Sequence, residues 1–312
     1  MVSIATSTVG GKSRSGRPGR TRARTLGVLG LAAVVAGATV PSAPAAWGAD
    51  DAEADATGIT FDPTHFTDPT TIDNPFLPLV PGTQLVLAGT ANRGSGQGSH
   101  RVVFTVTDIA KEIDGVRSLV VWDRDFQDGA LVEAELSFWA QDDDGNVWNM
   151  GEYPEEWEEG KLAGAPSTWL AGTQRAKAGI HMLADPVPGG PSYVQGRAPT
   201  IEFLDRGKVT AEHQKTCVPV GCYRDVMVTD EWNPLNQPAD GHQLKFSAPG
   251  VGIVRVEAVG GDEQETLVLS KYEQITPAAF TEARAKVFKL DQRAYTLAKA
   301  VWTGTPPATQ LP

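Results

Sequence analysis

Residues that build metal or nucleophilic sites are scarce in this chain of 312 residues, which has two cysteines and five histidines. The histidines are scattered along the sequence, and none forms the closely spaced pair typical of a metal site. Neither the Gly-x-Ser-x-Gly nor the His-Glu-x-x-His motif occurs. The sequence therefore predicts no metal and no cofactor, and it identifies no catalytic residue.

Positive charge is also in short supply, with 27 Lys and Arg against 38 Asp and Glu and a net charge of -11. Six of the basic residues lie in the first 25 positions, which hold no acid, so the rest of the chain carries a net charge of -17. Such an acidic surface repels phosphate groups. We therefore expect no nucleic-acid partner and no binding to anionic lipid head groups.

The first 45 residues have the features of a secretory signal peptide. Basic residues precede an uncharged apolar run, Leu26 to Val40, and small residues follow at Ala43 and Ala45. At 15 residues the run is too short to favour a stable membrane span, although an uncleaved anchor is the alternative. No cysteine follows the run as a lipid attachment point. We expect a secreted, extracellular protein without a stable membrane anchor.

Cys217 and Cys222 flank the short segment Val-Pro-Val-Gly at a corner between two predicted strands. Two cysteines around a short loop of an exported protein predict a disulfide bond. A metal site that also uses His213 is the alternative. Zinc needs three or four ligands, and no other cysteine is present, so the disulfide is the better prediction.

Residues 58–303 are expected to form one β-rich domain, after a disordered linker at 46–57 and before a tail at 304–312. Five prolines between Asp50 and Gly82 exclude a helix or a central strand there, and predict an extended arm over the first strands. Between Tyr153 and Pro191 the period-two alternation fades, which indicates a long excursion with one short helix.

A C-terminal helix is predicted over residues 277–302. Thr276 suits its N-cap, and Pro277 suits its first turn. Apolar residues three, four or seven apart form one stripe that should pack on the sheet. The members of this stripe are Phe280, Val287, Leu290, Ala294, Leu297 and Val301.

A stretch in the middle of the chain, SFWAQDDDGNVWNMGE, predicts a β-hairpin with long apolar arms. The Asp-Gly pair at 144–145 supplies the positive backbone angles of a two-residue type I′ turn. This turn would set Gln141 opposite Trp148 and Trp139 opposite Met150. A three-residue loop would overturn that assignment.

Both faces of this hairpin carry large apolar side chains, so neither is an ordinary solvent face. One face should be the main core, and the other a second core or a lined groove. Tryptophans beside carboxylates suit a ligand of mixed character. The predicted ligand-binding residues are Trp139, Trp148, Met150, Glu133, Glu135 and Gln141.

The carboxylates in and around this hairpin allow other functional interpretations, as catalytic acids or as calcium ligands. Glu133, Glu135 and Glu152 could act as the paired acids of a glycosidase, which requires separations of about 5 or 9 Å. The segment 142–146 resembles a calcium loop, but a turn explains it better because no glutamate closes the loop. Four glutamates around Trp157 are either solvated or a calcium site.

Three segments carry a family resemblance: NPFLPLVPGTQLVLAG, FWAQDDDGNVWNMGE and APGVGIVRVE. Across Phe61 to Tyr272 the chain resembles a family of uncharacterised exported bacterial proteins, and more distantly the LolA/LolB-like half-barrel lipoprotein carriers. The resemblance implies a mainly β (α+β) fold, a strongly curved antiparallel sheet or incomplete barrel, with a C-terminal α-helix in or against its concave side. It brings no catalytic residues.

The leading hypothesis is a secreted, non-enzymatic binding protein for an apolar or amphiphilic small molecule or lipid at the cell envelope. In the alternative without a ligand, the C-terminal helix fills the groove beside the tryptophans completely. Two other functions compete with binding: a secreted hydrolase acting on sugars or esters, and an acidic protein-interaction module.

Overall fold

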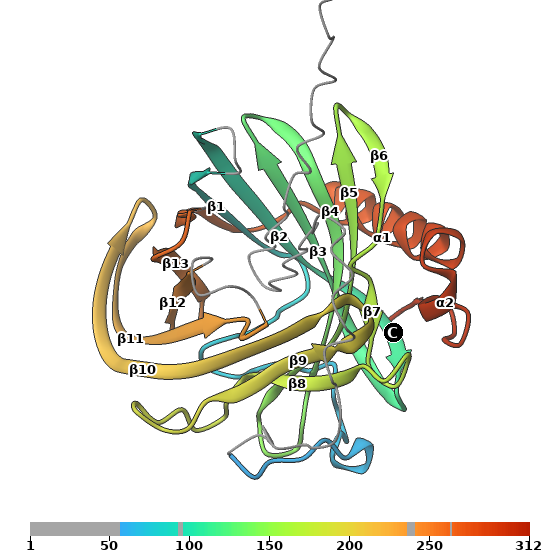
Figure 1. The fold of residues 1–312 in the computed structure, drawn as a ribbon, viewed down its shortest axis with the longest axis horizontal. Helices are drawn as coiled ribbons and strands as arrows, with labels where there is room; N and C mark the ends of the chain where they lie inside the picture. Colours follow the sequence, from blue (N-terminus) through green and yellow to red (C-terminus); the bar gives the residue numbers. More distant parts are fainter. Residues whose placement is uncertain (1–56, 93–95, 236–240, 263) are drawn as a thin grey trace, which may run out of the picture.

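The fold is a closed antiparallel barrel of twelve strands (Figure 1). The computed structural model describes residues 57–92, 96–235, 241–262 and 264–312. Around the barrel the strands follow the order β1-β2-β3-β4-β5-β8-β9-β10-β11-β12-β13-β14, and β14 returns to β1. The expected incomplete barrel is therefore wrong, because β1 pairs with β2 on one side and with β14 on the other.

The strands of the barrel wall have these bounds: β1 Thr83–Asn92, β2 Gln97–Ile113, β3 Val116–Gln127, β4 Ala130–Gln141, β5 Val147–Glu158, β8 Lys177–Met182, β9 Tyr193–Ala198, β10 Phe203–Val218, β11 Gly221–Trp232, β12 His242–Ala248, β13 Gly252–Val259 and β14 Thr266–Gln274. Short strands β6 (Lys161–Gly164) and β7 (Trp169–Leu170) pair with β5. Two 3-10 turns, η1 (Pro63–His65) and η2 (Pro199–Ile201), complete the β-rich part.

Closure of the barrel depends on a close approach between its first and last strands. Gly89 of β1 pairs with Leu267 of β14. A side chain on Gly89 would collide with the backbone carbonyl of Thr266. Glycine at this position therefore lets two strands that are far apart in sequence meet at hydrogen-bonding distance.

The segment between Tyr153 and Pro191 differs from its expectation. It contains the end of β5, then β6, β7 and β8, and it contains no helix. The period-two pattern is weak there because these strands are short and pair with different parts of β5.

The C-terminal helices pack on the outside of the barrel (Figure 1). They are α1 (Pro277–Leu297) and α2 (Lys299–Trp302), and the Thr276 side chain caps α1 by accepting a hydrogen bond from the Ala279 N–H, as predicted. Leu297 departs from the predicted stripe because it is exposed. Because the helices lie outside the barrel, the alternative in which the C-terminal helix fills the groove beside the tryptophans is wrong.

Charged side chains hold α1 to the outer wall. Arg284 donates two hydrogen bonds of 2.7 Å to Asp108 of β2. Lys111 of β2 is buried and lies 3.0 Å from Asp291 of α1. The segment expected as a tail adds β15 (Thr309–Gln310), which pairs with β2.

The proline-rich arm lies across one end of the barrel rather than over the first strands. Asn74 donates to the carbonyls of Gly145, in the β4–β5 loop, and of Leu183, which follows β8. The Gly250 N–H, in the β12–β13 turn, donates to the Pro75 carbonyl. The arm therefore ties together three loops at the same end of the barrel.

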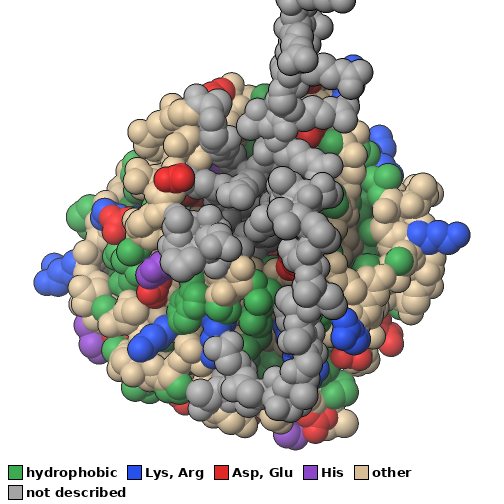
Figure 2. Space-filling model, viewed as in Figure 1, with side chains coloured by type: hydrophobic (Ala, Val, Ile, Leu, Met, Phe, Trp, Pro, Cys, Tyr) green, Lys and Arg blue, Asp and Glu red, His purple; other side chains and the backbone are tan. Residues whose placement is uncertain are grey.

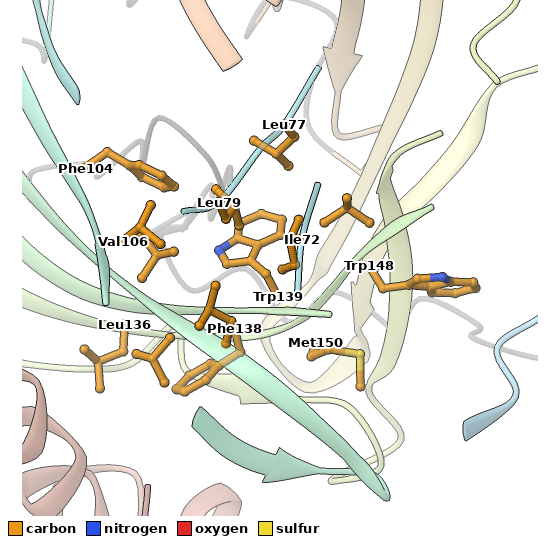
Figure 3. Packing of buried hydrophobic residues seen from close by; sticks show 14 of the residues in the cluster. Ile72, Leu77, Leu79, Phe104, Val106, Leu136, Phe138, Trp139, Trp148 and Met150 are labelled. Atoms are coloured by element: carbon orange, nitrogen blue, oxygen red, sulfur yellow. The ribbon is translucent and has the colours of Figure 1, made fainter. Parts of the chain in front are cut away.

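Apolar residues of the arm enter the barrel core. Ile72, Leu77 and Leu79 are each 3% exposed and belong to the main hydrophobic cluster. Figure 3 shows them on the same side of β4 as the Trp139 indole. The arm thus supplies the apolar floor of the barrel interior.

Cys217 and Cys222 form the predicted disulfide and face each other across the β10–β11 hairpin. The expected signal peptide, residues 1–45, and nearly all of the expected linker lie outside the described residues. Among the residues that the structure describes, no helix has the length and apolarity to cross a membrane.

Candidate functional site

The β4–β5 hairpin has a five-residue loop, residues 142–146, instead of the predicted two-residue turn. Gln141 pairs with Val147 across its base. The Asp142 carboxylate accepts hydrogen bonds from the backbone N–H groups of residues 144 and 146. Of the Asp-Gly pair only Gly145 has a positive φ, whereas a type I′ turn needs two. The side chain of Asp142 therefore stabilises the longer loop.

This register separates the predicted ligand-binding residues. Trp139 pairs with Asn149, and Trp148 pairs with Ala140, so the two indoles are on opposite faces. The Trp148 ring lies against Phe61 of the arm with centroids 5.5 Å apart, and its Nε1 donates to Asp142.

Two further predicted residues also lie apart from Trp139. The side-chain oxygen of Gln141 accepts hydrogen bonds from the backbone N–H groups of Asp73 and Asn74 in the arm. Met150 is the extra residue of a β-bulge, and Figure 3 shows it pointing away from the Trp139 indole. Of the six predicted residues, the structure brings together Trp139, Glu133 and Glu135.

Glu133 and Glu135 belong to a row of carboxylic acids on the inner face of the barrel, beside Trp139. Glu135 of β4 faces Asp123 of β3, and Ser137 of β4 faces Glu152 of β5. We call Asp123, Glu133, Glu135 and Glu152 the acid wall. Each of the four is less than a tenth exposed.

A hydrogen-bond chain joins Trp139 to this wall. The Trp139 Nε1–H donates to the Ser137 hydroxyl at 2.9 Å, and this hydroxyl donates to Asp123 Oδ2 at 3.0 Å. The Ser137 hydroxyl thus bridges the Trp139 indole and the Asp123 carboxyl group. The chain fixes the Trp139 ring at the edge of the acid wall.

Burial raises the pKa of three of these acids, Asp123, Glu135 and Glu152. It raises the pKa of Asp123 to about 8 against the hydrogen bond from Ser137, and the charges of Glu152 and Asp125 raise it further. Burial and then the charge of Glu152 raise the pKa of Glu135 well above its usual range. Burial also raises the pKa of Glu152, despite hydrogen bonds from Asn149 and Trp169. Asp123, Glu135 and Glu152 therefore hold their protons more tightly than ordinary carboxylic acids do.

A second polar group faces the acid wall from the other side of the barrel. Lys245 of β12 lies 2.5 Å from Glu231 of β11, and Gln195 of β9 donates to the same carboxylate at 3.1 Å. Burial opposes ionisation of Glu231, but the charge of Lys245 overcomes it and lowers the pKa. Lys245 also lowers the pKa of Glu152, so this second polar group, which we call the opposite wall, interacts electrostatically with the acid wall across the interior.

His181 of β8 links the two walls. Its ring lies edge-on to the Trp139 indole with centroids 4.8 Å apart. Burial lowers the pKa of His181 to about 4, so the imidazole is neutral at neutral pH. Neutral imidazole can pack against an indole without carrying an unpaired charge into the core.

Several buried oxygens inside the barrel lack a hydrogen-bond partner among the described residues. On the acid wall they are Asp123 Oδ1 and Glu135 Oε1, and on the opposite wall Thr229 Oγ1 and Gln243 Oε1. Leaving such an atom unpaired costs about 1–3 kcal/mol. A barrel of eight strands is already filled by its own side chains, and twelve strands enclose a wider interior. These oxygens are therefore the candidate hydrogen-bond partners that the barrel interior offers to a small molecule.

A third buried cluster contains His100 of β2. Its Nε2 lies 3.3 Å from Asp125 and 3.5 Å from Glu265. All three side chains are at most 3% exposed. Within the described part of the chain, no group of three or more His, Cys, Asp and Glu side chains is arranged to hold a metal ion.

Sequence reasoning missed Asp123, Glu231 and Lys245. The segment around Lys245 alternates polar and apolar residues, a pattern that indicates a strand with one solvated face. In the barrel that polar face points inward. Only Glu133 and Glu135 stand out in the sequence, because large apolar residues flank them.

The glutamates near Trp157 do not act as one group. Glu155 is fully buried on the outer wall, where it accepts hydrogen bonds from Arg293 of α1 and from the Tyr153 hydroxyl. On the described part of the face in Figure 2, acidic and basic side chains are interspersed. The expectation of an acidic interaction module therefore gains no support from a concentrated patch on that face.

Comparisons with known proteins do not assign a family. No family model matches the chain. No curated protein matches it. A predicted exported protein with a YmcC-like fold from Bacteroides fragilis is 15% identical, with 64% of this chain and 98% of that chain covered and a TM-score of 0.38. A predicted lipoprotein from Parabacteroides distasonis is 12% identical, with 64% and 99% covered and a TM-score of 0.35.

Similarity at these TM-scores does not establish a shared fold. Neither comparison tests the resemblance to LolA/LolB-like carriers, which stays a prediction from the sequence.

Proposed function

We propose that this protein is an exported, non-enzymatic binding protein that holds a small amphiphilic molecule inside its barrel. The observation that carries the proposal is the pair of unpartnered oxygens, Asp123 Oδ1 and Glu135 Oε1, on the wall that also bears Trp139. Buried polar groups are normally paired, and exceptions concentrate at functional sites. Export is inferred from the signal-peptide pattern of residues 1–45.

The ligand's two parts follow from the two kinds of surface inside the barrel. A polar head with hydrogen-bond donors would pair with the acid wall, because the oxygens of its ionised acids are acceptors. An apolar tail would lie against the Trp139 indole and the leucines of the arm, Leu77 and Leu79. This narrows the expected ligand from apolar or amphiphilic to amphiphilic.

The test is a titration of the protein, from residue 46 onward, with n-octanol, followed by tryptophan fluorescence and native mass spectrometry. We expect a 1:1 complex and a change in indole emission. Trp139→Phe should lose most of this change, whereas Trp148→Phe should keep it because Trp148 lies outside the barrel. Equal changes in both variants, or no complex with the unmodified protein, would reject binding inside the barrel.

Hydrolysis of sugars or esters is the second candidate. A general acid needs a carboxyl group whose pKa is raised, and burial raises the pKa of Glu135 well above its usual range. Glu152 and Asp123 lie on the same wall as possible partners. Turnover of 4-nitrophenyl glycosides or esters that Glu135→Gln abolishes would favour this function over binding alone.

A further inference from the structure

Buried carboxyl groups have different hydrogen-bond and ion-pair partners on the two walls of the barrel interior. Glu231 has the Lys245 ammonium at 2.5 Å and the Gln195 amide at 3.1 Å. Asp123 receives one hydrogen bond, from Ser137, and its Oδ1 has no partner among the described residues. Glu135 Oε1 likewise has none there, although the Glu135 carboxyl group shares a hydrogen bond with Glu133. Once Asp123 and Glu135 are ionised, the acid wall therefore has more acceptor oxygens than donors to satisfy them.

An independent observation comes from the opposite wall. Thr229 and Gln243 are 2% and 5% exposed, and Thr229 Oγ1 and Gln243 Oε1 are also without partners in the described part of the chain. Thr229 pairs in register with Lys245, so both side chains point into the barrel. The amide oxygen of Gln243 is an acceptor as well. Unsatisfied acceptors thus face the interior from both sides, and the buried donor beside them, Lys245 Nζ, has the Glu231 carboxylate as its ion-pair partner.

The excess of acceptors over donors indicates which polar head group of a ligand would fit. A primary ammonium has three donors and no acceptor, a hydroxyl has one donor, and a carboxylate has none. Hydrogen bonds between charged and polar groups are also stronger than neutral ones. An ammonium therefore matches the ionised acids best, and an anionic head, which their charges repel, matches them worst.

We infer that the polar head of the ligand is a primary ammonium group, which pairs with Asp123 and Glu135 as Lys245 pairs with Glu231 on the opposite wall. The inference rests on the proposed function, because it names the ligand class of the same interior. It makes the protein a binder of amphiphilic amines rather than of alcohols or fatty acids.

Proton release should accompany binding. The pKa values of Asp123 and Glu135 are raised because each side chain is buried and faces other acids. Asp123 is near Glu152, Asp125 and one cation, Arg124, and Glu135 is near Glu152, Glu133 and Asp123. An arriving ammonium stabilises the ionised carboxylates, so a carboxylic proton passes to the buffer. Isothermal titration in phosphate and in Tris, whose ionisation enthalpies differ, measures the number of protons released.

The experiment compares three ligands that share one chain: n-octylammonium, n-octanol and n-octanoate. At pH 7 we expect octylammonium to bind at least about tenfold more tightly than octanol, with octanoate weakest. Glu135→Gln and Asp123→Asn, which keep the side-chain shape, should remove most of this preference while affinity for octanol stays. Glu112→Gln, an exposed acid of β2, is the matched control and should leave the preference intact.

The outcomes separate the two proposals. If octanol binds inside the barrel as tightly as octylammonium, the ammonium inference is wrong and the binding function stands. If octylammonium is preferred equally by the Glu135→Gln and Asp123→Asn variants, the acid wall is not its site. If none of the three ligands binds, both proposals fail. The comparison of ligands on the unmodified protein does not depend on any variant folding.

Discussion

Phe138 and Trp139 are consecutive residues of β4 that belong to different cores. The Phe138 ring lies 5.7 Å from Trp302 on the outer wall, under the C-terminal helices. The Trp139 ring lies 4.8 Å from His181 inside the barrel. One strand thus carries the anchor for the helix on one face and the edge of the candidate binding site on the other. Variants of the two faces should therefore have separable effects.

Trp302→Ala should destabilise the protein by about 3–5 kcal/mol, because the indole is fully buried against Phe138 and Tyr153 and donates to Asp291. Urea unfolding followed by circular dichroism measures the loss. Phe288→Ala is the control, since Phe288 of α1 is 37% exposed and its removal should change stability by about 0.5 kcal/mol or less. Similar losses in both variants would contradict the packing described for α2.

Asp123 makes the protein less stable as pH rises. Its pKa is about 8 in the folded protein against an ordinary value of 3.8, so the folded state binds more protons between these values. The free energy of unfolding should therefore fall as pH increases from about 4 to 8. Asp123→Asn should make this dependence shallower, and the raised pKa values of Glu135 and Glu152 should leave a remainder of the same sign.

Urea unfolding at half-unit steps between pH 5 and 8 tests the Asp123 prediction. Asp144→Asn, in the β4–β5 loop, serves as the control and should keep the slope of the unmodified protein. A rise in stability over this range would contradict the assignment of Asp123 as a protonated acid.

Lys245→Met should cost about 3–5 kcal/mol, because it leaves the buried Glu231 carboxylate without its cation. Adding Glu231→Gln to Lys245→Met should recover part of the loss, since the uncompensated charge is then removed. Thermal or urea unfolding of both single variants and the double variant gives the coupling energy. Additive losses would show that the two side chains do not interact.

Replacing both Cys217 and Cys222 with serine should reduce stability by about 2 kcal/mol, because the disulfide closes a small loop. The loss should be local to the β10–β11 hairpin, which the bond joins near its tip. Hydrogen exchange should accelerate at the hairpin tip and remain unchanged in β4 and β5. Faster exchange throughout the barrel would contradict a local role.

Local signals in the sequence were sufficient where the structure depends on neighbouring residues. The Thr276 cap, the helix that follows and the Cys217–Cys222 bond each involve groups close together in the chain. The β4–β5 hairpin was also placed correctly by its alternation. Its register was wrong because an Asp-Gly pair fits both a two-residue turn and a longer loop, and the Asp142 side chain stabilises the longer one.

The sequence by itself determined the β-rich character, the C-terminal helix and the disulfide, because alternation, capping and close spacing act over a few residues. Only the tertiary structure decided that the sheet closes, that α1 packs outside and that polar faces point inward. β1 meets β14 across about 180 residues of chain, and Lys245 faces Glu152 only once that closure exists. Such pairings follow from the curvature and register of the whole barrel, for which no short segment carries a signal.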